Sequence, residues 1–251
     1  VAVDDISQAL AISEAAQADE VTVGLLVETD CGMGRCGVPP GKPTLQLVQQ
    51  IADLPSIRFD GIQAFEGHLV YVNDYEERQR KLHESMEPVI QTRHLIEENG
   101  IHVPTVSGGA SSTYKITGAI EGFGEIQAGT YATMDWRYHE LTPEFHIALS
   151  ILVTVISRPK PGTAVLDMGV KGAGGEFGPP RIKGYPQVET PGFASEEHMI
   201  VQNTPSWRVG DKLEAISSHA CTTCNLYREL YVHEDEKVVD VWPIEASGRL
   251  A

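Results

Sequence analysis

The sequence predicts an α/β domain made of parallel βα units over residues 1–143, followed by an all-β domain over residues 144–251. Two observations support this prediction. Strand-like runs alternate with helix-like runs in the first segment, which is the pattern of parallel βα units. From residue 144 onward, short β-rich stretches are separated by Gly, Pro and Asp, which is typical of an all-β domain. We expect two domains with a functional site at their junction.

The elements of the first domain follow from hydrophobic periodicity. Val21 to Glu28 is a nearly continuous apolar run, as in a strand covered on both faces. Apolar side chains at helical spacing predict a helix over Thr44 to Asp53, with Thr44 as its N-cap, and a long charged helix over Tyr75 to Asn99. The other expected strands are 57–65, 105–107 and 125–127. Polar or glycine-containing loops follow the strands, at the carboxyl ends where α/β folds place their sites.

The second domain is expected to consist of short strands. The β-rich stretches are residues 148–157, 163–167, 198–202, 212–216, 226–232 and 238–242.

Composition and charge exclude several classes of function. The 251 residues are 41% apolar, which is enough for a full core, and 19 Lys and Arg against 35 Asp and Glu give a net charge of −16. That charge repels phosphate backbones and anionic lipids, so neither nucleic acid nor a membrane surface is an expected partner. No apolar run is long enough to span a bilayer. Four cysteines are too few for a disulfide scaffold and indicate a reducing, cytoplasmic location.

A glycine-rich loop follows the first predicted strand. Gly32, Gly34 and Gly37 satisfy the G-x-G-x-x-G pattern of dinucleotide-binding proteins. Prolines at 39, 40 and 43 prevent a helix from beginning where a pyrophosphate would need free N–H groups, which argues against a nucleotide. Arg35, the one cation of this loop, is either a partner for a ligand atom or a solvated loop arginine.

Two later loops have the composition of an anion site. The segment SGGASSTY, residues 107–114, places small and hydroxyl side chains after one strand, and Gly129, Thr130 and Tyr131 follow the next. Backbone N–H groups and hydroxyl donors of this kind suit a phosphate, although the same residues also make ordinary turns. Two such loops at consecutive strand ends favour the phosphate.

A possible metal motif lies near the C-terminus. His219, Cys221 and Cys224 offer the imidazole and thiolate ligands that suit zinc. A closed structural site needs four ligands, and the remaining pair, Cys31 and Cys36, lies in the other predicted domain. We therefore expect an open site, with His219 and Cys221 on one side of an extended segment. The alternative is one buried histidine and two buried cysteines without a metal.

Taken together, the chain resembles the D-threonine aldolase and D-serine dehydratase family of pyridoxal-phosphate enzymes. The segments that carry the resemblance run in order along almost the whole chain: VAVDD, VETDCGMGRCGV, GIQAFEGH, VSGGASSTY, GEIQAGTY, VISRPKPG, VLDMGVK, SEEH, SHACTTCNLY and VWPIEASGR. The resemblance implies an alanine-racemase-like fold, in which residues 1–143 form the C-terminal half of a TIM-type βα barrel that precedes the all-β domain. It also implies a homodimer.

The resemblance also implies roles for individual residues. Arg35 lies beside the pyridine ring of pyridoxal 5'-phosphate, and Gln63 lines the cofactor pocket. His68 is the candidate base, and His219 and Cys221 bind a divalent metal, Zn, Mn or Mg, that grips the substrate's β-hydroxyl. The residues expected around the phosphate are Gly109, Ser111, Gly129, Thr130 and Tyr131. Ala110 and Ser112 depart from the family, which usually has Gly at both positions.

The expected activity is that of a lyase acting on a D-3-hydroxy amino acid. An aldolase would cleave it to glycine and an aldehyde, and a dehydratase would release a 2-oxo acid and ammonia; Cys221 resembles the dehydratase arrangement. The family's Schiff-base lysine lies on the first barrel strand, and no lysine of this chain matches it. We expect the chain to be the C-terminal portion of the enzyme and inactive alone. The alternative is a relic without that lysine that acts only by binding.

Overall fold

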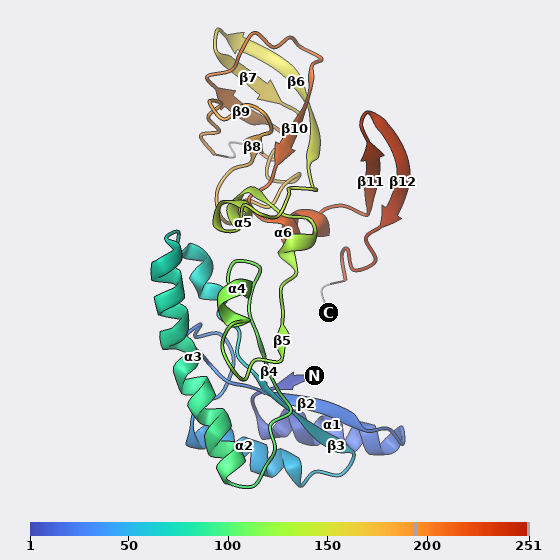
Figure 1. Cartoon of the computed structure of the whole chain (residues 1–251). Helices are drawn as coiled ribbons and strands as arrows, with labels where there is room; N and C mark the ends of the chain where they lie inside the picture. Colours follow the sequence, from blue (N-terminus) through green and yellow to red (C-terminus); the bar gives the residue numbers. More distant parts are fainter. Residues whose placement is uncertain (193–194, 250–251) are drawn as a thin grey trace. The chain divides into compact units, whose positions relative to one another are not determined.

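The computed structural model describes residues 1–192 and 195–249. The chain divides into two compact units, Val1–Gly129 and Thr130–Ala251 (Figure 1). Residues after Gly129 join the second unit through hydrogen bonds: Asp135 Oδ2 accepts the N–H of Ala220 at 3.0 Å, and the Trp136 N–H donates to the Ser217 carbonyl at 3.1 Å. The units divide before residue 143, where the sequence pattern changes, and the boundary expected there stays a prediction.

The first unit contains a five-stranded parallel sheet. Its strands are β1 (Ala2–Val3), β2 (Val23–Glu28), β3 (Ile57–Gln63), β4 (Thr105–Gly108) and β5 (Glu125–Ile126). They lie in the order β1-β2-β3-β4-β5, so every strand is beside its neighbour in sequence. A doubly wound sheet would reverse direction at some point, whereas the wall of a βα barrel does not. The predicted α/β class of the barrel type is confirmed.

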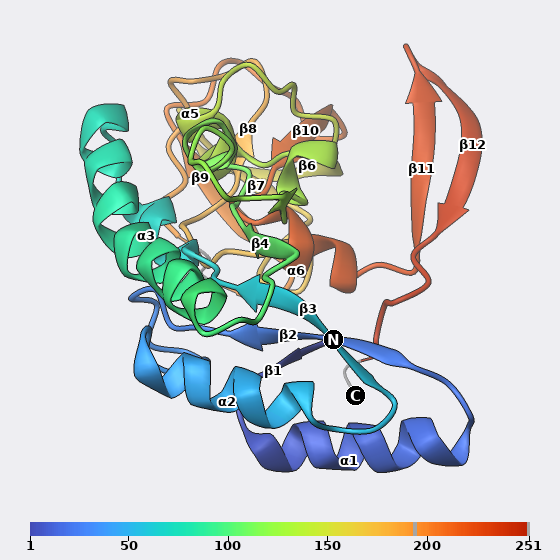
Figure 2. The same ribbon diagram turned by 60° about the horizontal axis from the view of Figure 1, so that its bottom comes forward.

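Three long helices connect the strands: α1 (Ile6–Ala18), α2 (Lys42–Ala52) and α3 (Tyr75–Glu98). Figure 2 shows them beside the sheet, where α1 packs on α2 and α2 packs on α3. Buried apolar residues of all three helices and of the sheet form one core. The short elements between the later strands are η1 (Gly67–Tyr71), a 3-10 helix, and α4 (Tyr114–Thr117).

The start of α2 differs from the prediction. Gly41, not Thr44, is the N-cap, and Pro43 lies in the first turn. A proline is tolerated there because the first N–H groups of a helix have no intrahelical acceptor. Thr44 is buried, and its hydroxyl donates to the Pro39 carbonyl at 2.8 Å.

The second unit is mostly antiparallel β structure. A five-stranded sheet has the order β8-β10-β6-β7-β9, where β6 is Ile151–Lys160, β7 is Thr163–Leu166, β8 is Arg181–Ile182, β9 is Met199–Gln202 and β10 is Lys212–Ile216. One face of it carries the second core. The unit also contains the short helices η2 (Thr130–Ala132), α5 (Trp136–Leu141) and α6 (Ala220–Asn225). The strand expected over 226–232 is displaced because α6 reaches its C-cap at Leu226.

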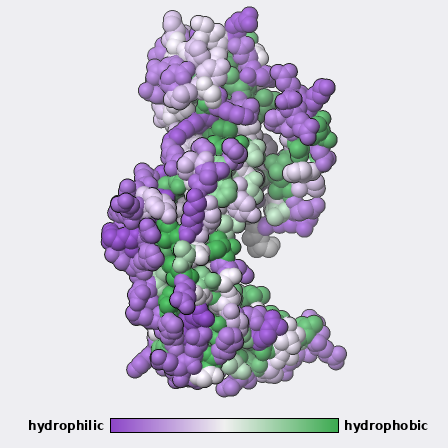
Figure 3. All heavy atoms as spheres, viewed as in Figure 1, coloured by the Kyte–Doolittle hydropathy of each residue, from purple (hydrophilic) through white to green (hydrophobic). Residues whose placement is uncertain are grey.

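A separate hairpin of β11 (Glu229–Glu234) and β12 (Lys237–Pro243) follows α6. It exposes large apolar side chains, among them Tyr231, Val238 and Trp242. Figure 3 shows hydrophobic and hydrophilic residues side by side on this hairpin. Within the described ranges, no helix is both long and apolar enough for a membrane span.

Candidate active site

The glycine-rich loop after β2 uses its own N–H groups internally. Asp30 Oδ1 accepts the N–H groups of Gly32 at 2.9 Å and Gly34 at 3.1 Å, and Asp4 Oδ2 accepts that of Gly37 at 2.8 Å. The three glycines have φ angles of 109°, 64° and 106°, which few other residues adopt. The donors that a pyrophosphate would need are already bound to carboxylates. The structure thus gives a second reason to exclude a dinucleotide.

Two predicted cofactor residues meet beside a carboxylate that sequence reasoning missed. Gln63, the last residue of β3, donates from Nε2 to Glu28 Oε2 at 3.1 Å. Arg35 Nη2 lies 3.8 Å from Glu28 Oε1, and its guanidinium lies 5.7 Å from the centre of the Phe65 ring. Glu28 is the last residue of β2, so the pairing of adjacent parallel strands brings its side chain next to Gln63. Arg35 lies in the loop after β2, and about half of its side chain is exposed.

His68 lies in η1, shortly after β3. Its Nδ1 is buried and has no hydrogen-bond partner among the described residues. An unsatisfied buried ring nitrogen costs free energy unless a ligand or water pairs with it. Asp30 lies on the neighbouring glycine-rich loop, where the N–H of Gly34 is the main cause of the lowered pKa of its carboxyl.

The loop after β4 is built around a buried carboxylate. Glu66 is fully buried and accepts three hydrogen bonds: from the Gly109 N–H at 3.0 Å, the Thr113 hydroxyl at 2.6 Å and the Thr117 hydroxyl at 2.9 Å. The Gly109 N–H, expected at the phosphate, is therefore committed to Glu66. Ser111 is buried in the same loop. Glu66 was missed because its partners lie more than forty residues away in the sequence.

The next predicted loop crosses from one unit to the other. A Cβ added at Gly129 would meet no atom within 4 Å, which leaves space beside its backbone. Thr130 and Tyr131 belong to the second unit. Tyr131 is half exposed, and its ring centroid lies 5.6 Å from that of Phe145.

His219 and Cys221 meet at the beginning of α6. His219 is the N-cap, with extended φ and ψ of −144° and 110°, and Cys221 lies in the first turn. The expectation of an extended segment is wrong for Cys221. Two residues that are two positions apart inside a helix do not face each other. His219 and Cys221 can meet because His219 is an extended N-cap and not a helical residue. Their mutual hydrogen bond raises the pKa of the His219 imidazole and lowers the pKa of the Cys221 thiol, to which Thr130 contributes further.

Two carboxylates support this pair. Glu176 Oε2 lies 3.4 Å from His219 Nδ1, close enough for an ion pair but not aligned as a hydrogen bond, and it accepts the Thr222 hydroxyl at 2.9 Å. Asp135 is buried and accepts the N–H that follows His219. Burial raises the pKa of Asp135.

The donor set fits a divalent metal of the zinc type. An imidazole nitrogen and a thiolate in mutual contact are the ligand types that zinc prefers. Over the described ranges, no cluster of three or more His, Cys, Asp or Glu side chains could hold an ion. A metal bound here would therefore have two protein ligands from this chain and open positions, rather than a closed structural site. The cysteines of the chain are free thiols.

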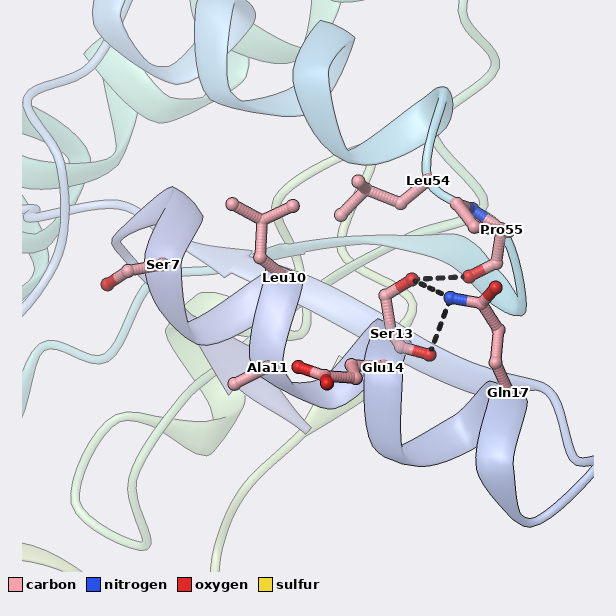
Figure 4. Close-up of a pocket in the computed structure, with 8 residues that line it drawn as sticks. All are labelled: Ser7, Leu10, Ala11, Ser13, Glu14, Gln17, Leu54 and Pro55. Carbon is pink, nitrogen blue, oxygen red and sulfur yellow. Dashed lines mark hydrogen bonds between the residues drawn. The ribbon is translucent and has the colours of Figure 1, made fainter.

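A hollow of about 500 Å³ lies elsewhere, between α1 and the turn that precedes β3. Figure 4 shows Ser13 and Gln17 of α1 facing Leu54 and Pro55 across it. The Ser13 hydroxyl donates to the Pro55 carbonyl at 2.6 Å. None of the expected site residues lines this hollow.

Comparisons with known proteins agree with the fold and identify the family. The family model "Alanine racemase, N-terminal domain" matches residues 1–135, and the model "Putative serine dehydratase domain" matches residues 148–233. The chain is 32% identical over 259 residues to the 3-hydroxy-D-aspartate aldolase of Paracoccus denitrificans (strain Pd 1222), and 34% identical over 255 residues to a D-threonine aldolase of an Arthrobacter species. Each alignment covers 99% of this chain and 67% of the relative.

A solved structure gives the same result. The crystal structure of the D-threonine aldolase from Filomicrobium marinum superimposes with a TM-score of 0.94 at 30% identity, over 100% of this chain and 70% of that one. The fold and these matches define an enzyme of the lyase class with an alanine-racemase-like fold. The chain belongs to the D-threonine aldolase and D-serine dehydratase family, which is a family of pyridoxal-phosphate enzymes.

Proposed function

We propose that the protein of this chain is a pyridoxal-phosphate- and divalent-metal-dependent lyase that cleaves D-3-hydroxy amino acids to glycine and an aldehyde. The observation that carries the proposal is the contact between His219 and Cys221 at the start of α6. An open site with two ligands can accept a substrate hydroxyl, which a closed zinc site cannot. The activities named for the two aldolase relatives support the same substrate class.

The residues of the two units have different roles in this proposal. His219 and Cys221 hold the metal, which supplies Lewis-acid polarisation of the substrate's β-hydroxyl. The cofactor supplies the electron sink for the negative charge that develops at Cα. Arg35 and Gln63 line the pyridine ring, and both side chains contact Glu28.

The proton of the β-hydroxyl must leave for the Cα–Cβ bond to break. We assign its removal to His68, whose Nδ1 is buried without a partner among the described residues. For the phosphate, the assignment covers Ser111, Gly129, Thr130 and Tyr131, and excludes the Gly109 N–H because Glu66 already accepts it.

A dehydratase activity is the second candidate. The match of residues 148–233 to the serine dehydratase model supports it, because this stretch contains His219 and Cys221. The products differ: a dehydratase releases ammonia and a 2-oxo acid, whereas an aldolase releases glycine.

The test is made on the natural gene product, loaded with pyridoxal phosphate and Zn²⁺. D-threonine and D-serine are supplied separately, and glycine, aldehyde, ammonia and 2-oxo acid are quantified. Glycine and acetaldehyde from D-threonine support the aldolase, and ammonia with pyruvate from D-serine supports the dehydratase. Absence of all four products, with no cofactor trapped on a lysine by borohydride, overturns the proposal in favour of a protein that acts only by binding.

The metal ligands are tested by a matched pair of substitutions. Cys221→Ala should lower Zn²⁺ affinity by at least about a hundredfold, because one of the two proposed protein ligands is lost. Cys224→Ala, three residues further along α6, should leave that affinity unchanged. Equal affinities in the two variants would contradict the assignment of Cys221.

Two further features belong to the proposal. We propose a reducing, cytoplasmic location, supported by four free cysteines. We also propose a homodimer, which sedimentation of the natural gene product tests directly.

A further inference from the structure

The loop after β4 contains a hydroxyl that nothing described so far uses. Ser112 is 3% exposed, and its Oγ has no hydrogen-bond partner among the residues that the structure describes. A buried hydroxyl without a partner is destabilising, so proteins seldom retain one without a ligand or water to pair with it.

Three backbone donors near Ser112 are already used. Glu66 accepts the Gly109 N–H, the Ala110 N–H donates to Thr113 Oγ1 at 2.9 Å, and the Thr113 N–H donates to the Ala110 carbonyl at 3.0 Å. The loop is therefore held on both sides of Ser112 by bonds that no ligand needs to supply.

Glu66 is the centre of this arrangement. Its carboxylate comes from the loop after β3 and binds three donors of the segment that follows β4. Bonds from donors to a buried carboxylate are strong, and breaking one would leave a buried charge poorly satisfied. Glu66 thus fixes the backbone of one strand-end loop to that of its neighbour.

We infer that Glu66 is a positioning residue for the β4 loop, and that the arrangement it holds makes the Ser112 hydroxyl a donor to the phosphate group of the cofactor. This inference rests on the proposed function and deepens it, because it changes the donors: the Ser112 hydroxyl binds the phosphate, and the Gly109 N–H does not. A serine hydroxyl suits a phosphate oxygen because it is a single rotatable donor.

The test compares two ligands that differ only in the phosphate. The apo form of the natural gene product is titrated with pyridoxal phosphate and with pyridoxal, and binding is followed by quenching of tryptophan fluorescence. Inorganic phosphate is used as a competitor. Ser112→Ala should lower the affinity for pyridoxal phosphate by about tenfold, which is the effect of losing one hydrogen bond to a charged group. The same substitution should also make inorganic phosphate a weaker competitor. Affinity for pyridoxal should stay within about twofold.

Thr204→Val is the matched control. Thr204 Oγ1 is also a buried hydroxyl without a partner among the described residues, but it belongs to the second unit, and the loop after β4 belongs to the first. Its removal should leave both affinities unchanged. If Ser112→Ala behaves like Thr204→Val, or weakens both ligands equally, the Ser112 assignment is wrong.

Glu66→Gln tests the positioning role. Glutamine keeps one oxygen for the threonine hydroxyls but turns an NH₂ group toward the Gly109 N–H, so the loop should loosen. The ratio of pyridoxal to pyridoxal phosphate dissociation constants should then fall by about fivefold or more. A lower melting temperature with an unchanged ratio would assign Glu66 a structural role only, and tighter binding of pyridoxal phosphate would show that Glu66 opposes the phosphate; either result overturns the positioning role. If the unsubstituted protein binds neither ligand, it is the proposed function that fails.

Discussion

Asp30 Oδ1 accepts the backbone N–H of Gly34 at 3.1 Å and closes the glycine-rich loop on its own carboxylate. The loop has the spacing of a nucleotide-binding fingerprint, yet its donors are used before any ligand arrives. The arrangement shows why such a spacing is weak evidence alone: what matters is whether the N–H groups remain available.

Removal of this carboxylate should destabilise the loop. Asp30→Ala leaves the N–H groups of Gly32 and Gly34 without their acceptor, and we expect a loss of about 1–2 kcal/mol in the free energy of unfolding. Urea denaturation measures this loss in the free energy of unfolding. Asp53→Ala is the control, because Asp53 is exposed and its side chain makes no hydrogen bond that we observe. Equal losses in the two variants would contradict the role of Asp30.

The same carboxylate should make the loop sensitive to acid. The N–H of Gly34 holds the pKa of Asp30 below its ordinary value of 3.8. A carboxyl whose pKa is lowered on folding contributes stability above its unfolded pKa and loses it as the pH falls through the folded pKa. The difference between the unsubstituted protein and Asp30→Ala should therefore be full at neutral pH and shrink well below pH 3.8. A difference that is independent of pH would exclude the ionised form as the acceptor.

The cysteines should differ sharply in reactivity when no metal is bound. The hydrogen bond to His219 lowers the pKa of the exposed Cys221 thiol, whereas burial raises the pKa of Cys31 to about 12. Thiolates are the reactive form, so iodoacetamide at pH 7 should modify Cys221 faster than Cys31 or Cys224. Mass spectrometry of peptides gives the three rates. Zn²⁺ should protect Cys221 selectively, and equal protection of Cys224 would point to a general conformational effect.

Gly61 should be intolerant of substitution. It has a φ of 136°, and a Cβ at this position would overlap the carbonyl oxygen of Thr105 on the neighbouring strand. Gly61→Ala should destabilise the first unit by about 3 kcal/mol, from backbone strain and displacement of β4. Gly129→Ala is the matched control, since the space beside Gly129 is open, and it should change stability by less than about 0.5 kcal/mol. Thermal denaturation compares the two.

Much of the fold could be predicted because the strands are strongly patterned. The expected strand over 212–216 is β10 without change, and the other buried strands differ from the expectation mainly at their ends. Helix α1 was not predicted because its apolar face is weak, although Asp5 and Gln8 form a capping box that would have indicated its start. Helix α6 was not predicted either; at its start the hydroxyls of Thr222 and Thr223 donate to the carbonyl of the N-cap His219, a local contact that residue types alone do not decide.

The candidate site was less accessible to sequence reasoning. The sequence pattern could locate the loops at the strand ends, but it could not predict the hydrogen bonds that form inside these loops. Glu28 and Glu66 acquire their partners only when parallel strands pair, so no spacing in the sequence indicates either contact. The assignments of Arg35, Gln63 and the phosphate residues stay predictions until ligand binding is measured.

The carboxylate of Glu66 also has a consequence for how the first unit opens. Its bonds tie two neighbouring loops together, so neither can move away without leaving the buried Glu66 carboxyl short of hydrogen-bond donors. The amide of Gly109 should therefore exchange its hydrogen with solvent only in openings that disrupt β3 and β4 together. Although loop amides ordinarily exchange quickly, this one should exchange as slowly as those of the sheet.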